Sequence, residues 1–121
     1  MWEVEFYELE SGRCPVNDYL QTLNGKLDLP YIMHEIELLE ELGYELRRPH
    51  AAPLRDKIYE LRPESVSGKF RFFYFFDKDK IIITHGFKKK KGPVGNHQIE
   101  LAIKYRKSYL EREKNETKRV S

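Results

Sequence analysis

The sequence predicts an α+β fold, in which an antiparallel β-sheet packs on an N-terminal helical hairpin and is followed by a C-terminal helix. Apolar and acidic residues alternate over residues 2–6, as in a strand with one solvated face. Apolar residues then recur at helical spacing over residues 15–42, and strand-like runs alternate with turn sequences over residues 54–91. The length fits one compact domain, which we expect over residues 1–113, with a polar tail over residues 114–121.

The predicted helices are bounded by residues that commonly begin or end helices. Pro15 suits the first turn of a short helix that Asn24 and Gly25 end. A second helix is expected from about Leu29 to Leu42, with Gly43 as its C-terminal cap. Residues 44–53 contain two prolines and no periodicity, which indicates an irregular connection. A last helix is expected over about residues 96–113, with an apolar arc of roughly 200° that exceeds the width a surface helix needs.

Residues 54–91 are expected to form a three-stranded meander, and two turns set its strand pairing. One is centred between Val66 and Ser67, and the other is the sequence DKDK at residues 77–80. The resulting pairs are Arg62–Arg71, Leu61–Phe72, Glu60–Phe73, Phe76–Ile81, Tyr74–Ile83 and Phe72–His85.

Alternation then divides the meander into two faces. The first is almost wholly apolar, and we expect it to form the core against the helical hairpin: Tyr59, Leu61, Phe70, Phe72, Tyr74, Phe76, Ile81, Ile83, His85 and Phe87. The second mixes charged and aromatic residues: Ile58, Glu60, Arg62, Arg71, Phe73, Phe75, Ile82, Thr84 and Gly86, with Lys88 and Lys90 too if the strand direction persists.

The second face has the composition of a phosphate-binding surface. Arg62 and Arg71, placed opposite each other, repel unless an anion lies between them, and Glu60 and a phosphate group are the two candidates. Phe73 and Phe75 offer surfaces on which bases stack, unless the C-terminal helix covers them.

The charge of the chain is strongly asymmetric. Residues 1–46 hold two basic and eleven acidic side chains, a net charge of 2 − 11 = −9, whereas 20 basic and 9 acidic side chains give residues 47–121 a net charge of 20 − 9 = +11. Either the two halves attract each other within the fold, or the basic half binds an anionic partner such as nucleic acid or an acidic protein.

Several other classes of protein are poorly supported. Cys14 is the only cysteine, the four histidines have no ligand-like spacing, and neither common glycine-rich phosphate loop occurs. We therefore expect no metal and no cofactor. The N-terminal residues alternate with glutamates, unlike a signal peptide, and no apolar run approaches the ~20 residues of a membrane span. We expect a cytoplasmic protein without membrane contact.

Four stretches together resemble a known toxin family: LRDKIYELRP, KFRFFYFF, THGFKKK and QIELAIKYR. They are similar to the HigB-like, phage-associated branch of the RelE/ParE toxin superfamily, over roughly residues 2–110. The resemblance implies a RelE-like fold and the toxin of a type II toxin–antitoxin system, an endoribonuclease that cuts mRNA in the ribosomal A site without metal. It also implies a cognate antitoxin, which we expect to be a helix-turn-helix protein. The oligomeric state is left open.

The resemblance also implies roles for individual residues. Arg71 matches the family arginine that holds the scissile phosphate, and Arg62 matches the arginine of the ELR motif. Lys89 and Lys90 match the lysines after HGF, where they would stabilise the transition state or the leaving oxygen.

The chain departs from the family pattern after these lysines. The family usually continues with threonine, glutamine and Lys-Thr-Pro, whereas residues 91–95 are Lys-Gly-Pro-Val-Gly. The proton-transfer residue therefore stays open between Glu60 and His97. The residues expected only to contact RNA are Lys88, Lys91, Phe73, Phe75 and Lys69.

Two other functions remain as alternatives. One is a ParE-like poison of DNA gyrase, which has no catalysis of its own. The other is a non-toxic RNA-binding or regulatory protein on the same fold, an alternative made plausible by the changed residues after Lys90.

Overall fold

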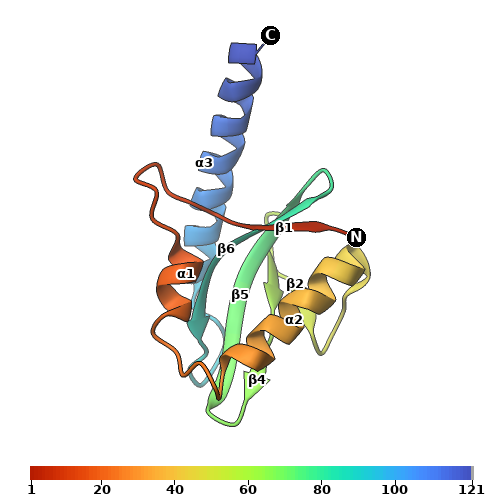
Figure 1. The fold of residues 1–121 in the computed structure, drawn as a ribbon, viewed down its shortest axis with the longest axis vertical. Helices are drawn as coiled ribbons and strands as arrows, with labels where there is room; N and C mark the ends of the chain where they lie inside the picture. The colour runs from red at the N-terminus through yellow and green to blue at the C-terminus, as the bar shows by residue number, and fades with distance from the viewer. Residues whose placement is uncertain (121) are drawn as a thin grey trace.

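The computed structural model shows a mixed six-stranded sheet with helices on both faces (Figure 1). The structure describes residues 1–120, and the side chains of residues 1–117. Five strands follow the order β1-β6-β5-β3-β2, and β4 pairs with the beginning of β5. The elements in chain order are β1 (Glu3–Phe6), α1 (Pro15–Leu20), α2 (Leu29–Leu42), the 3-10 helix η1 (Gly43–Glu45), β2 (Ala51–Pro53), β3 (Tyr59–Leu61), β4 (Glu64–Ser65), β5 (Gly68–Asp77), β6 (Lys80–Lys88) and α3 (Asn96–Val120).

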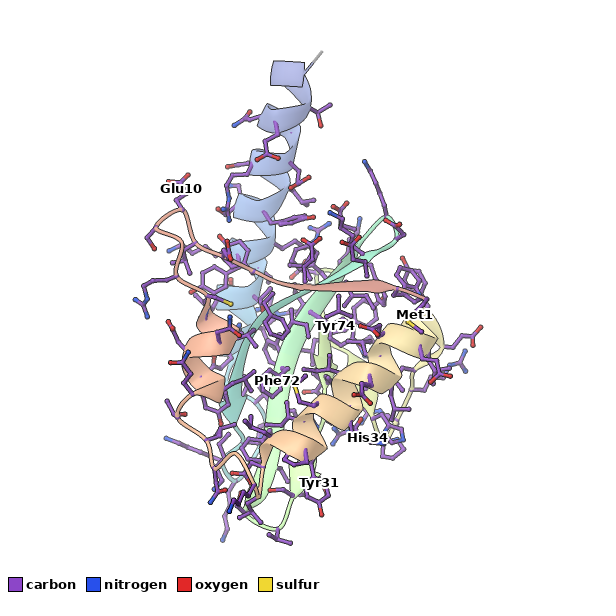
Figure 2. All side chains as sticks on the ribbon, in the orientation of Figure 1. Met1, Glu10, Tyr31, His34, Phe72 and Tyr74 are labelled. Carbon is purple, nitrogen blue, oxygen red and sulfur yellow. The ribbon has the colours of Figure 1, made fainter. Side chains whose placement is uncertain are left out.

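The helical hairpin covers one face of the sheet, as predicted. Val16 of α1 and Ile36 of α2 are buried against Phe72 and Tyr74 of β5. Figure 2 shows Phe72 and Tyr74 beside α2, on the face of β5 that the two helices cover. The expected bounds of α2 are confirmed, and Gly43 ends the helix with a positive φ of 52°.

Two expectations about the sheet are wrong. β1 pairs with β6 in the parallel direction, so the sheet is mixed rather than antiparallel. The alternation in residues 2–6 identifies a strand and its faces but contains no information on strand direction. Residues 51–53 are the edge strand β2 rather than irregular chain. Three residues ending in proline are too few to show a period of two.

The strand pairings of the meander are largely confirmed. Leu61 lies opposite Phe72, Phe76 opposite Ile81, and Tyr74 opposite Ile83.

A β-bulge then interrupts the β5–β6 pairing. Phe73 pairs with His85, which leaves Thr84 as an extra residue. The expected Phe72–His85 pair is wrong, because one extra residue exchanges the faces of all that follow. His85 and Phe87 lie on the second face, while Gly86 lies opposite Phe72, whose ring a Cβ at Gly86 would overlap.

α3 covers the second face and projects beyond the sheet (Figure 1). It continues to Val120, so the expected helix end near residue 113 is wrong, and Ser121 of the expected tail lies outside the described residues. No glycine or proline follows Gly95, and residues 111–117 are mostly charged side chains with high helix propensity. Within the described part of the chain no helix is long and apolar enough to cross a membrane.

Candidate functional site

Glu60 lies between Arg62 and Arg71 on the face that α3 partly covers. Arg71 Nε is 3.5 Å from Glu60 Oε1, and Arg62 Nε is 3.9 Å from Glu60 Oε2. The β3–β5 register that pairs Leu61 with Phe72 places Arg62 and Arg71 at the next step along the two strands. Of the two candidate anions, the structure thus supplies Glu60, which offsets the repulsion between the arginines.

The two arginines differ sharply in accessibility. Arg71 is 2% exposed, and its Nη1 donates a hydrogen bond to the Phe70 carbonyl oxygen at 2.8 Å. Its Nε has no hydrogen-bond partner among the side chains and backbone that the structure describes. Burial lowers the pKa of Arg71, and the Glu60 carboxylate opposes this shift. The Arg62 side chain is 27% exposed, so Arg62 is the arginine that a ligand can reach directly.

The lysine run forms the rim of a pocket beside this cluster. Lys89 continues the pairing with β5, since its N–H donates to the Lys69 carbonyl oxygen at 2.7 Å, and its Nζ donates to the Gly92 carbonyl oxygen at 2.7 Å. Lys90 is exposed. The pocket has a volume of about 230 Å³ and is lined by Phe87, Lys88, Lys89, Lys90, Pro93, Val94, Gly95, His97 and Gln98. Lys89 therefore holds its own loop, while Lys90 is available to a ligand.

The pocket and the arginine cluster are adjacent. Phe87, which lines the pocket, is the residue opposite Arg71 in the β5–β6 pairing. His97, in the first turn of α3, is exposed and belongs to the same wall. A ligand that fills the pocket thus meets Lys90 and His97, and the Phe87 in the pocket wall lies one strand spacing from Arg71.

His85 is buried between α3 and the sheet. Its ring nitrogens lie 3.0 Å from Thr84 Oγ1 and 2.9 Å from Gln98 Oε1. Burial lowers the pKa of His85 to about 4, so the ring is neutral near pH 7. Sequence reasoning missed Gln98, which both holds this ring and lines the pocket. Only its position one residue after His97 could have indicated it.

Phe73 and Phe75 do not belong to an exposed surface. Both are fully buried, in the cluster that contains Ala102 and Tyr109 of α3. The expectation that they stack RNA bases is therefore wrong, and the alternative, that the last helix covers them, is the arrangement found.

The other expected RNA contacts are spread around the end of the meander. Lys88 passes over Gly68 and helps to lower the pKa of Asp28, which places it on the face that α2 covers. Lys69 and Lys91 are exposed, and Lys69 lies 3.9 Å from Glu64. None of these three lysines joins the Glu60 cluster among the contacts of the described side chains. Among residues 1–117, no three His, Cys, Asp or Glu side chains lie where they could hold a metal ion.

Comparison with known proteins gives one family match. The model of the family described as phage derived protein Gp49-like (DUF891) matches residues 18–107, which are 90 of the 121 residues. The matched region begins within α1 and includes the whole meander, the lysine run and the sheet-covering half of α3. No curated protein matches the chain.

Proposed function

The chain belongs to the Gp49-like family of phage-derived proteins, within the RelE/HigB-like toxin group, and from this premise we propose that it is the toxin of a type II toxin–antitoxin system that cleaves mRNA on the ribosome. The observation that carries the proposal is the position of Glu60 between two arginines, beside a pocket rimmed by Lys90 and His97. Closely spaced cations beside an open pocket are suited to phosphate chemistry.

A phosphate can compete with Glu60 for the arginines. The 3.5 and 3.9 Å separations are longer than charge-assisted hydrogen bonds, which are about 2.7–2.9 Å. Arg62, which is partly exposed, therefore has donors free for a phosphodiester. Because Arg71 is buried, it can bind the same phosphate only after neighbouring side chains move, and we propose that RNA binding opens this contact.

The proposed reaction is an internal transfer at phosphorus. The ribose 2′-oxygen forms a bond to the adjacent phosphorus while the bond from phosphorus to the 5′-oxygen breaks, which gives a 2′,3′-cyclic phosphate and a 5′-hydroxyl. One proton leaves the 2′-hydroxyl and one reaches the 5′-oxygen, so no co-reactant is consumed. Arg62, Arg71 and Lys90 would stabilise the charge on the phosphorane oxygens, and one such donor is typically worth about 10²-fold or more in rate.

His97 is the better of the two candidates for proton transfer. It is exposed in the pocket wall, and histidine is suited to gain and lose a proton near neutral pH. Glu60 is buried and engaged by both arginines, so we assign it as the residue that positions them. Lys89, bound to its own loop, positions Lys90 in the same sense.

We further propose that the cognate antitoxin, a helix-turn-helix protein, binds the outer side of α3. A groove of about 490 Å³ there combines the half-buried apolar side chains of Ile103 and Leu110 with an excess of basic residues. Its charged lining residues are Lys57, Arg106, Lys107 and Lys114 against Asp56 and Glu111. An acidic amphipathic segment complements such a surface in both charge and apolar area.

The proposal is tested by inducing the protein in bacteria and pulse-labelling protein and DNA synthesis, with the 5′ ends of mRNA mapped in parallel. We expect translation to stop first, with mRNA cut inside codons. Arg62→Gln should remove both effects, whereas the control Arg13→Gln, which removes an exposed arginine paired with Asp18, should retain them.

Other outcomes would overturn the proposal. Arrest of DNA synthesis with translation intact would identify a ParE-like gyrase poison. Absence of any growth effect, with the chain folded and abundant, would identify a non-toxic binding protein. An Arg62→Gln protein that still cuts mRNA would refute the assignment of the site.

A further inference from the structure

A second pocket lies at the β2 edge of the sheet, on the side of α2. Its volume is about 490 Å³, within the usual range of ligand sites, and its wall contains Tyr44, Tyr59, Arg47 and Arg48 beside the small apolar side chains of β2. The proposed catalytic cluster shares no residue with this wall.

The two tyrosines are held as fixed aromatic walls. Tyr44 is 60% exposed, although its ring stacks on Phe76 with the centroids 3.9 Å apart and meets the edge of Trp2 at 4.9 Å. Tyr59 stacks on Tyr74 at 5.5 Å. Because one side of each ring is packed against the core, little conformational freedom is lost when a planar ligand covers the other side.

Arg47 and Arg48 add unpaired positive charge to the pocket. Both are exposed, and neither side chain makes an ion pair or a hydrogen bond with another described residue. Their backbone is fixed, since the Arg47 carbonyl oxygen accepts hydrogen bonds from the N–H groups of His50 and Ala51. Arg47 is also the first residue of the basic half of the chain.

We propose that this pocket binds one nucleotide of single-stranded RNA, with the base against Tyr44 or Tyr59 and the flanking phosphates at Arg47 and Arg48. Aromatic rings beside a positively charged groove are the usual means of holding unpaired nucleotides. The inference rests on the proposed function, because it gives the RNA that is cut at the Arg62 site a second contact.

The pocket lies at the edge of the sheet, beside the chain that leads to Arg62. The His50 carbonyl oxygen accepts a hydrogen bond from the Arg62 N–H at 2.8 Å, so the chain that leads from Arg47 into β2 lies about 4.8 Å, one strand spacing, from β3. Tyr59 and Arg62 lie on opposite faces of the sheet, so one RNA strand that contacts both sites passes around this edge of the sheet.

A protein strand is the less suitable occupant of this edge. β2 has three residues and ends in Pro53, which has no N–H to donate to an added strand. The wall of the pocket also presents aromatic rings and guanidinium groups, which match a base and a phosphate more closely than they match a peptide backbone.

The test measures binding of a fluorescently labelled, fully 2′-O-methylated single-stranded RNA to the full chain by fluorescence anisotropy. This RNA lacks the attacking hydroxyl and cannot be cut, so binding is measured independently of cleavage. Tyr44→Leu should weaken binding about tenfold, whereas Tyr44→Phe, which keeps the ring, should bind normally. Arg47→Gln with Arg48→Gln should weaken binding and reduce the slope of log K against log salt by roughly 1.4 for two phosphate contacts.

Matched controls remove equivalent groups elsewhere. Tyr31→Leu removes an exposed tyrosine near the other end of α2 (Figure 2), and Lys26→Gln with Lys104→Gln removes two exposed positive charges away from the pocket. Both should bind the RNA with the native affinity. Thermal melting of every variant shows whether it is folded.

Three outcomes overturn the inference. In the first, folded Tyr44→Leu protein binds RNA as the native chain does, so that no base stacks there. In the second, the Lys26 and Lys104 control variant loses as much affinity as the Arg47 and Arg48 variant, so that binding is only general electrostatic attraction. In the third, the pocket variants bind RNA normally but no longer bind the antitoxin. Failure of the proposed function is distinct, because it would appear as intact RNA binding without cleavage or growth arrest.

Discussion

Replacing Arg71 by alanine should lower the free energy of unfolding by about 3 kcal/mol. Arg71 is almost fully buried, and its removal leaves the buried carboxylate of Glu60 with only Arg62, at 3.9 Å. Removing one partner of a buried ion pair costs about 3–5 kcal/mol. The lower end applies because Arg62 still neutralises part of the charge.

This change in stability corresponds to a large shift in melting temperature. An unfolding entropy of about 2.1 cal/mol/K per residue gives a chain of 121 residues about 0.25 kcal/mol/K. A loss of about 3 kcal/mol therefore lowers the Tm by about 12 °C. Arg62→Gln should cost about 0–1 kcal/mol, or less than about 4 °C, because its long ion pair is partly solvated.

Calorimetry or circular-dichroism melting of the two variants tests this reasoning. Arg71→Ala protein that melts within about 4 °C of the native chain would refute the view that Glu60 depends on a buried partner. The loss should also shrink in a Glu60→Gln background, where no carboxylate remains to be neutralised. The comparison matters for function, since loss of toxicity in Arg71→Ala alone reports on folding as well as on phosphate binding, whereas Arg62→Gln separates the two.

Two further perturbations test the buried side of the site. The unfolded chain protonates His85 near pH 6.5 and the folded chain only near pH 4, so acid should remove up to about 3 kcal/mol of stability between these values. Urea unfolding at several pH values should show this loss, and His85→Gln should flatten it while His97→Gln does not. Phe73→Ala should cost about 3–5 kcal/mol by creating a cavity under α3. A Phe73→Ala protein of native stability but weakened RNA binding would restore the base-stacking role that its burial contradicts.

The sequence predicts most of the secondary structure because local signals mark it. Pro15 and Gly43 lie where helices begin and end, and the turns at residues 66–67 and 77–80 set strand pairings that the structure confirms near each turn. The direction of a strand and the burial of a side chain depend on contacts between distant parts of the chain. β1 pairs in parallel with a strand more than 70 residues later, and no pattern in either strand records that choice.

Local signals also predict one part of the candidate site. The grouping of Glu60, Arg62 and Arg71 follows from the register of a single hairpin, which a turn determines. The burial of Phe73 depends on how α3 returns across the sheet, and this return is a tertiary contact without a local signature.

The bulge at Thr84 shows how one residue determines the chemistry of the site. An unbroken ladder would turn Phe87 and His85 toward the core under α1 and α2, and would place Lys88 beneath α3. The extra residue instead places Phe87 opposite Arg71 and directs Lys88 toward Asp28. Phe87 thereby becomes part of the pocket wall at the step of the sheet where Arg71 lies. A bulge beside an active site commonly redirects side chains in this way, and here it places Phe87 on the α3 side of the sheet and Lys88 on the α2 side.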